Sequence, residues 1–190
     1  MILMKDIVRE GNEVLKQTAK EVEIPLSIED KETICEMMNY LYDSCDEETC
    51  EKYGLRPGVG LAAPQIGVSK RMFVIAAPNE KGQFFELAII NPKIISYSDE
   101  LTYLPGGEGC LSVDREVEGL IHRPYKIRVQ GYVYDFEKND AFLQTLVLRG
   151  YLAVVFGHEY DHLNGTLFVD RINKANPFFV PENSKPIKFK

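Results

Sequence analysis

Residues 149–164 read RGYLAVVFGHEYDHLN, a stretch that predicts a helix with a metal-binding motif on one face. His158 and His162 are four residues apart, so on an α-helix both imidazoles lie on the same face and can reach one ion. Glu159 is offset by one residue, which places its carboxylate beside the ion, where it can take a proton from a bound water. Gly165 follows directly and is well placed to cap the helix C-terminus.

Two histidines do not complete a catalytic metal site, which needs a third protein ligand and an open position for water. One class of metalloprotease extends the motif to HExxHxxGxxH, but the last position of that pattern holds Phe168 here. Another protease class takes its third ligand from a glutamate on a following helix. The candidate here is Glu182, but it lies between two prolines that exclude a continuous helix. Cys110 lies in a glycine-rich run, GGEGCLS (106–112), where a thiolate is sterically free to approach an ion. A lone cysteine is more often an inert buried thiol, but beside this incomplete motif Cys110 is the favoured third ligand.

A second glycine-rich stretch, GVGLAAPQIG (58–67), lies in a segment that we expect to be a loop from residue 55 to 69. Its first residues formally match a dinucleotide-binding fingerprint. No strand is expected before it, however, and Pro64 interrupts the helix that should follow, which argues against nucleotide binding. Gly58 and Gly60 permit close approach of the backbone to a ligand, and Gln65 offers an amide NH2 group to a carbonyl oxygen.

The rest of the chain predicts an α+β fold in one domain covering residues 1–190. Apolar residues at three- and four-residue spacing predict a second helix, which begins after Ser27 and ends before Gly54. Runs rich in Ile, Val and Phe predict strands at 71–77, 85–91, 93–97, 125–135 and 141–148. Strands grouped between two helices, without regular alternation, indicate antiparallel sheets packed around the central motif-bearing helix.

Composition excludes several classes of function. The 190 residues are 45% hydrophobic and 27% charged, as in an ordinary globular protein. The net charge of −7, with dispersed basic residues, argues against direct nucleic-acid binding. No run approaches the ~18 apolar residues of a membrane helix, and charges occupy the N-terminus where a signal peptide would be apolar. The four cysteines form no disulfide framework. Taken together, these features lead us to expect a cytoplasmic protein that does not bind membranes.

Three motifs occur in a recognisable order: GVGLAAPQ (58–65), EGCLS (108–112) and HEYDH (158–162). Together they resemble the peptide deformylase family, which is marked by GxGLAAPQ, EGCLS and HExDH, and the resemblance covers nearly the whole chain. The insertions before the first motif and the lack of a C-terminal helix are similar to the longer, type 2 bacterial subgroup. Gly157 departs from the family pattern, because a glutamine usually precedes the first histidine.

The resemblance implies a role for each motif. The implied metal ligands, with water as the fourth, are Cys110, His158 and His162. Glu159 would act as general base and then as the acid that protonates the leaving amine, while Gln65 and the backbone N–H of Leu111 would stabilise the oxyanion. The substrate would be the N-formylmethionyl end of a nascent polypeptide, and the products formate and a free N-terminus. The family works best with one Fe²⁺ per chain, although Ni²⁺, Co²⁺ or Zn²⁺ can occupy the site. The resemblance also implies a transient association with the ribosome.

Helix geometry adds candidates for the substrate pocket. Tyr151 and Val155 lie seven and three residues before His158 on its face of the helix, a spacing that suits a pocket wall and a core position equally well. The full set of expected substrate-binding residues is Val59, Gly60, Glu108, Gly109, Tyr151 and Val155. We further expect Asp161 to pair with Arg123 and so orient the helix.

Two rival functions make different predictions. An endopeptidase that uses the same HExxH motif would cleave unblocked peptides and give Cys110 no role. A closed structural metal site would need a fourth protein ligand, for which the remaining histidine, His122, is the only spare one.

Overall fold

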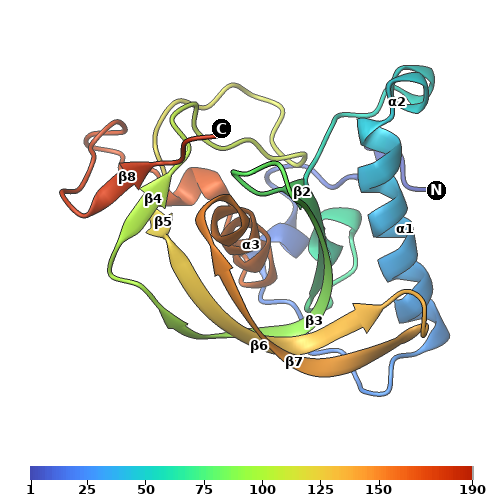
Figure 1. The fold of residues 1–190 in the computed structure, drawn as a ribbon. Helices are drawn as coiled ribbons and strands as arrows, with labels where there is room; N and C mark the ends of the chain where they lie inside the picture. The colour runs from blue at the N-terminus through green and yellow to red at the C-terminus, as the bar shows by residue number, and fades with distance from the viewer. Residues whose placement is uncertain (190) are drawn as a thin grey trace.

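A five-stranded antiparallel sheet curves around the helix that carries both motif histidines, α3 (Figure 1). The structure, a computed structural model, describes residues 1–189. The strand order is β1-β2-β3-β6-β7, with bounds Gly60–Ala62, Met72–Pro78, Phe84–Tyr97, Lys126–Asp135 and Asp140–Arg149. This arrangement confirms the predicted α+β class.

A smaller sheet joins the C-terminal segment to the rest of the fold. Its order is β5-β4-β8, with bounds Arg123–Pro124, Leu101–Tyr103 and Ser184–Pro186. β4 pairs antiparallel with β5 but parallel with β8, so the expectation of purely antiparallel sheets is wrong at this one pairing. The remaining short elements are 3₁₀ helices at Met4–Asp6, Glu13–Lys16, Ala63–Ile66 and Phe168–Arg171.

The long N-terminal helix predicted from residue 28 is interrupted once. α1 covers Ile28–Cys45 and α2 covers Glu47–Tyr53. Asp46 is extended (φ −80°, ψ 119°); its N–H still donates to Tyr42, while its side chain accepts a bond from the N–H of Thr49. One aspartate therefore ends α1 and caps α2, a break that apolar spacing alone does not reveal.

The strands predicted at 85–91 and 93–97 form one strand, β3, with a bulge between them. Asn91 has φ 49°, and its side-chain amide bonds both the N–H and the C=O of Val22. Pro92 lies within this bulge, where no ladder hydrogen bond is needed from its nitrogen. The Asn91-Pro92 pair at the junction of the two predicted strands is thus accommodated inside one continuous strand.

Two apolar cores lie on opposite faces of β2. Met72 and Val74 pack into the core that contains α1, whereas Phe73 and Ile75 pack into the core that contains α3. Alternation along the strand follows from the two-residue period of β structure. Phe73 meets Phe156 of α3 edge to face, with ring centroids 5.0 Å apart. The sheet is therefore buried on both faces at β2, which fixes α3 against β1 and β2.

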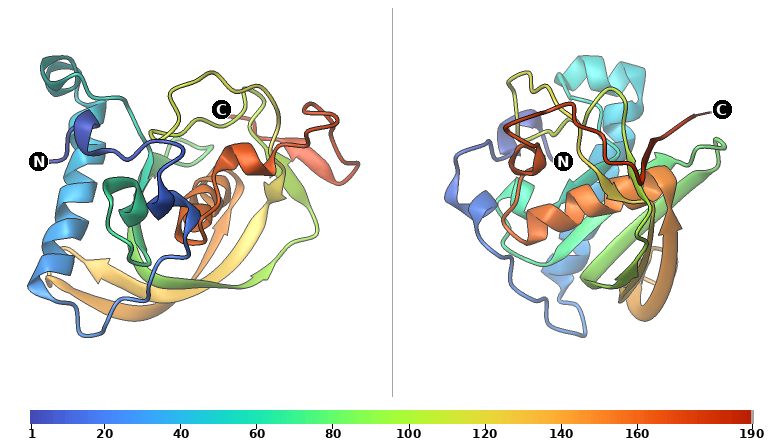
Figure 2. Two further views of the ribbon diagram at one scale, coloured as in Figure 1. Left: turned by 180° about the vertical axis from the view of Figure 1, so that it is seen from behind. Right: turned by 90° about the vertical axis from the view of Figure 1, so that its left-hand side faces the viewer.

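α3 spans Gly150–Leu163 and contains all of HEYDH. Gly165 lies just beyond it with φ 69°, and its N–H donates to the carbonyl of His162, as expected for a C-terminal cap. The N-terminal segment runs beside this end of the helix (Figure 2), where the N–H of Ala19 donates to the carbonyl of Leu163.

The expected loop at residues 55–69 contains structure that the sequence did not indicate. Gly60–Ala62 form β1, which pairs antiparallel with β2, and a 3₁₀ helix follows at Ala63–Ile66. The short edge strand is stabilised by its partner and by α3 rather than by its own β propensity. It places the first motif directly against the helix that carries the third.

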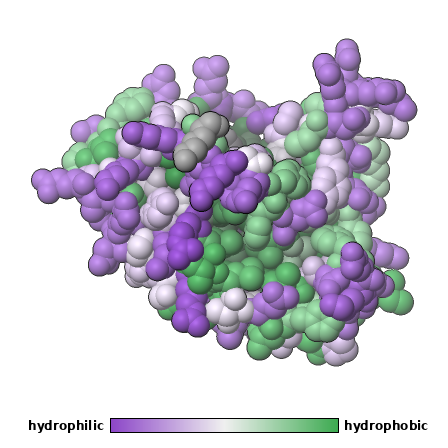
Figure 3. Space-filling view, in the orientation of Figure 1, coloured by the Kyte–Doolittle hydropathy of each residue, from purple (hydrophilic) through white to green (hydrophobic). Residues whose placement is uncertain are grey.

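Hydrophobic residues gather on the lower part of the face shown in Figure 3, over the sheet, with hydrophilic residues around them. Exposed apolar side chains of β7 include Phe142, Leu143 and Val147. Among the described residues, no helix combines the length and the apolar character needed to cross a membrane.

Candidate metal centre and active site

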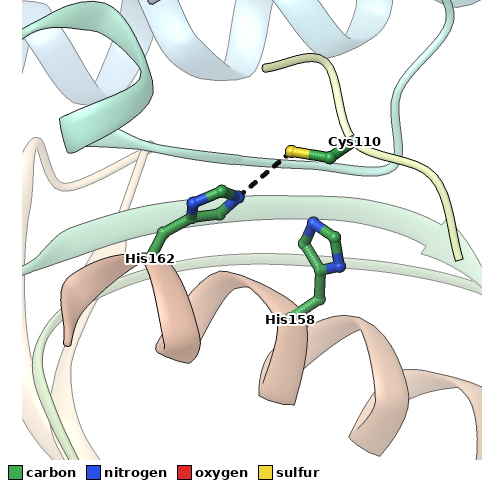
Figure 4. A group of neighbouring side chains, drawn as sticks. All are labelled: Cys110, His158 and His162. Carbon is green, nitrogen blue, oxygen red and sulfur yellow. Dashed lines mark hydrogen bonds between the residues drawn. The ribbon is translucent and has the colours of Figure 1, made fainter. Parts of the chain in front are cut away.

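Cys110, His158 and His162 come together as one group, here called the ligand triad (Figure 4). Their ligand atoms all lie within 4.8 Å of one another. The two histidines project from α3, and Cys110 faces them from the loop that contains the second motif. The Sγ atom of Cys110 is 3.4 Å from Nε2 of His162. The three residues that sequence reasoning selected are therefore neighbours.

The spacing and chemistry of the ligand triad fit a divalent cation. Ligands at ~2.3 Å for sulfur and ~2.1 Å for nitrogen in a tetrahedral site lie about 3.6 Å apart, close to the distance observed between Cys110 and His162. Thiolate and imidazole ligands suit iron, zinc, cobalt and nickel. Burial lowers the pKa of His162 well below its ordinary value, which favours the neutral imidazole that binds metal.

Glu108 holds His158 in place. Its Oε2 atom is 2.8 Å from Nδ1 of His158, so Nε2 is the nitrogen of this histidine that remains available to bind a metal ion. Burial alone would raise the pKa of Glu108, but the charge of Arg123 and the bond to His158 lower it to about 2. Both carboxylate oxygens also accept bonds from Arg123, at 2.6 and 3.0 Å. The carboxylate that we expected to contact substrate is thus engaged with protein groups, an arrangement typical of a residue that orients a metal-binding histidine.

The predicted pair between Asp161 and Arg123 is present. Nη1 of Arg123 donates to Asp161 at 2.9 Å, and both side chains are about 5% exposed or less. Arg171 also binds the Asp161 carboxylate. A Cβ at Gly157 would lie 3.1 Å from Nη1 of Arg123, so the glycine leaves room for this guanidinium beside α3. The close packing of Arg123 against residue 157 therefore gives a steric reason for glycine at this position, where the family usually has glutamine.

Replacement of Asp161 by asparagine is expected to weaken metal binding about 10-fold, because loosening Arg123 also loosens the Glu108–His158 bond. Competition with a chelator measures the affinity. The matched control is Asp170→Asn. Asp170 lies on the 3₁₀ helix that follows α3, and its carboxylate accepts a bond from the N–H of Leu167 rather than from Arg123. Unchanged metal affinity in Asp161→Asn would contradict the orienting role.

Glu159 is a buried carboxylate without a fixed partner for one oxygen. Its residue exposure is 3%, and Oε2 has no hydrogen-bond partner among residues 1–189. Burial raises its pKa to about 7, despite the opposing charges of His158 and Arg123. A carboxylate with such a pKa accepts and returns a proton near neutral pH.

Gly60 makes the space that Glu159 occupies. A Cβ at residue 60 would clash with Oε1 of Glu159 and would lie 2.8 Å from its Cγ. The close approach predicted for this glycine is therefore an approach to a protein carboxylate.

Replacement of Gly60 by alanine is expected to lower kcat about 10- to 100-fold, because it displaces the Glu159 carboxylate from its position. Steady-state kinetics and metal analysis check this result, with metal content expected to stay unchanged. Gly106→Ala is the control, since a Cβ there meets nothing within 4 Å. Normal turnover by Gly60→Ala would show that the position of Glu159 is not critical.

Gln65 is held with its amide NH2 group toward the second motif. Its Oε1 accepts a bond from the N–H of Ala62 at 2.9 Å, which fixes the orientation of the amide. Nε2 lies 3.3 Å from Oγ of Ser112 and 3.4 Å from Sγ of Cys110. The N–H of the intervening Leu111 donates to no group within the described part of the chain. Two donors therefore lie close to the ligand triad.

A cavity of about 330 Å³ opens beside the ligand triad. Its walls include all six residues expected to bind substrate, together with Gln65, Leu111 and Glu159. Gly58, where we expected close approach of the backbone to a ligand, also lines the cavity. Sequence reasoning missed further lining residues, namely Cys45, Arg56, Pro57, Leu104 and Val154. Val154 lies four residues before His158, so helix spacing could have found it. The others carry no such signal, because only the tertiary fold brings them to the cavity.

His122 is engaged away from the ligand triad. Its Nδ1 is 2.6 Å from Oγ of Ser184, and its Nε2 is 2.8 Å from the carbonyl oxygen of Phe179. It is not part of the potential metal-binding group found among residues 1–189. This placement argues against the closed structural site that needed His122 as its fourth ligand.

Comparisons with known proteins agree on one family. The polypeptide deformylase family matches residues 4–178. The chain is 50% identical over 188 residues to peptide deformylase 2 of Bacillus cereus, covering 99% of this chain and 100% of that protein. It is 52% identical over 182 residues to a peptide deformylase of Shouchella clausii, covering 95% and 97%.

Solved structures give the same result. The peptide deformylase of Thermotoga maritima matches with a TM-score of 0.66 and 36% identity, covering 88% of this chain and 96% of that one. An actinonin-bound class I type b peptide deformylase of Acinetobacter baumannii matches with a TM-score of 0.67 and 29% identity, covering 91% and 99%. On these matches, the chain belongs to the polypeptide deformylase family.

Proposed function

We propose that this chain is a metal-dependent peptide deformylase, which hydrolyses the formyl amide of N-formylmethionyl peptides and releases formate. The observation that carries the proposal is the buried, partly unpartnered carboxylate of Glu159 in a cavity beside the Cys-His-His triad. Membership of the polypeptide deformylase family supports the choice of substrate.

The positions of the side chains support the roles proposed for them. A divalent cation held by the ligand triad would supply Lewis-acid catalysis and lower the pKa of a bound water. Glu159 takes a proton from the attacking water and later delivers it to the leaving amine nitrogen. The Nε2 group of Gln65 and the N–H of Leu111 donate hydrogen bonds to the oxygen that becomes negative as the formyl carbon turns tetrahedral.

The substrate occupies the cavity with its methionine side chain against an apolar wall. We propose that Val59, Tyr151 and Val155 form this wall, and that Gly109 leaves room for the peptide backbone. A related deformylase of Acinetobacter baumannii, 29% identical, has been solved with Met-Ala-Ser bound. This relative supports the proposal that a short methionyl peptide binds in the same cavity of this chain.

Several properties of the enzyme extend this proposal. We propose Fe²⁺ as the preferred ion, with Ni²⁺, Co²⁺ or Zn²⁺ as substitutes, and one domain covering residues 1–190. A ferrous ion next to a thiolate is oxygen-sensitive, since both can be oxidised. We also propose a cytoplasmic location and transient contact with the ribosome, where formylated nascent chains emerge.

One experiment separates this function from that of an HExxH endopeptidase. Protein purified without oxygen is incubated with formyl-Met-Ala-Ser and, separately, with unblocked Met-Ala-Ser. The proposal predicts formate together with intact Met-Ala-Ser from the first peptide, and no reaction with the second. Cleavage of an internal peptide bond would support the endopeptidase, and no reaction with either peptide would contradict both functions.

A further inference from the structure

Arg56 reaches across the cavity rim to the loop that carries Cys110. Its Nη2 atom donates to the carbonyl oxygen of Cys110 at 3.2 Å, and Nη1 donates to that of Leu111 at 3.5 Å. A third bond, from Nη2 to the carbonyl of Val113, is also 3.5 Å long. One guanidinium therefore binds three carbonyl groups of a four-residue turn.

The bond to Cys110 concerns the peptide unit that matters most in the proposed reaction. The C=O of Cys110 and the N–H of Leu111 belong to the same planar amide, so a donor at the oxygen restrains the direction of the N–H. A charged donor at the oxygen also polarises the amide and strengthens the N–H as a donor. That N–H donates to no protein group among residues 1–189 and remains available to a ligand.

Arg56 itself is held from two sides. Its carbonyl oxygen accepts a bond from the hydroxyl of the buried Tyr40 of α1 at 2.9 Å. Its Nη1 also binds the Asp114 carboxylate at 2.8 Å, just after the turn. The backbone and the side chain are thus both fixed, which gives the guanidinium a defined direction toward the turn.

We propose that Arg56 is a positioning residue that orients and polarises the Cys110–Leu111 peptide, so that the Leu111 N–H stabilises the oxyanion of the formyl transition state. The proposal rests on the deformylase function and adds a residue outside the three family motifs. Arg56 acts through the amide and takes no proton.

The chain offers a closely matched control in Arg9. Arg9 binds the same Asp114 carboxylate at 2.9 Å, and its side chain is 36% exposed against 43% for Arg56. It also donates to backbone carbonyls, but these belong to Met4 and Ile7 in the N-terminal segment. Of these two arginines, Arg56 is the one that donates to the turn beside the ligand triad.

The test compares Arg56→Met, Arg56→Lys and Arg9→Met, each assayed for formate release and analysed for metal. Arg56→Met is expected to lower kcat about 10-fold, with KM changed by less than about threefold and metal content unchanged. Arg56→Lys keeps a charged donor and is expected to recover part of the loss. Arg9→Met is expected to keep kcat within about twofold of wild type.

A second readout does not depend on turnover. In ¹H–¹⁵N spectra of the zinc-loaded protein, the Leu111 amide proton is expected to move to lower frequency in Arg56→Met but not in Arg9→Met, because its amide loses polarisation. If Arg56→Met is misfolded, the same shift is sought in Arg56→Lys, where it should be smaller.

Several outcomes would overturn the proposal. One is an unchanged kcat together with an unchanged Leu111 signal in Arg56→Met. Another is a rise in KM alone in that variant, which would make Arg56 a substrate-binding group. The third is a loss of activity in Arg56→Met that follows the loss of metal. A wild-type protein that releases no formate would instead contradict the proposed function, while the Leu111 signal would still test the orienting contact.

Discussion

Replacement of Glu159 by glutamine is expected to lower kcat for formate release at least about 1,000-fold, within the range for loss of a positioned general base. The amide cannot take a proton from the attacking water, although it nearly matches the carboxylate in size. The Glu159 carboxylate is buried, has an oxygen free of protein partners and has a pKa raised to about 7 by burial. All three properties are those of a group that exchanges a proton within the cavity.

Metal content separates this effect from damage to the site. Because Glu159 is not one of the ligand triad, the glutamine variant is expected to bind one ion per chain with unchanged affinity. Glu118→Gln, a change in the loop before β5, serves as a control for the loss of one carboxylate. If Glu159→Gln kept more than about a tenth of the wild-type kcat, the proton-transfer role would be wrong.

Replacement of Cys110 by serine is expected to weaken metal binding more than about 100-fold, beyond the loss seen when only an orienting partner of a ligand is removed. A hydroxyl is a poorer ligand than a thiolate for the cations that imidazoles favour, and it stays protonated near neutral pH. Metal-to-protein ratios after dialysis against a chelator give the result directly. Formate release should fall in proportion to the metal that is lost.

A second cysteine provides the control. Cys50 lies in α2 and donates to the carbonyl of Leu55 at 3.2 Å, a bond that serine can also make. Cys50→Ser is therefore expected to keep wild-type metal content. Full metal occupancy in Cys110→Ser would show that this residue is not a ligand.

Local patterns predicted the elements that depend on nearby residues. The HExxH spacing predicted α3 and the placement of its two histidines, since four residues make about one turn of any α-helix. Ser27 was found as a cap because its oxygen accepts from the N–H of Asp30, three residues ahead. The ligand triad followed from motif chemistry, and the fold brings its three members together.

The features that sequence missed depend on distant partners. The strand β1 contains only three residues and exists because β2 and α3 pack against it. The parallel pairing of β8 with β4 joins residues more than eighty positions apart. Arg56 lies in a stretch with no periodicity, and its contacts with Cys110 and Leu111 arise only from the path of the chain between α2 and β1.

Titration of the metal-free protein with Ni²⁺, which is less prone to oxidation than Fe²⁺, tests the central claim most directly. Formate release from formyl-Met-Ala-Ser is recorded at each addition. We predict no release without metal, a linear rise, and a plateau at one ion per chain. Release by the metal-free protein, or none at saturating metal, would contradict the assignment of Cys110, His158 and His162 as the centre of a deformylase.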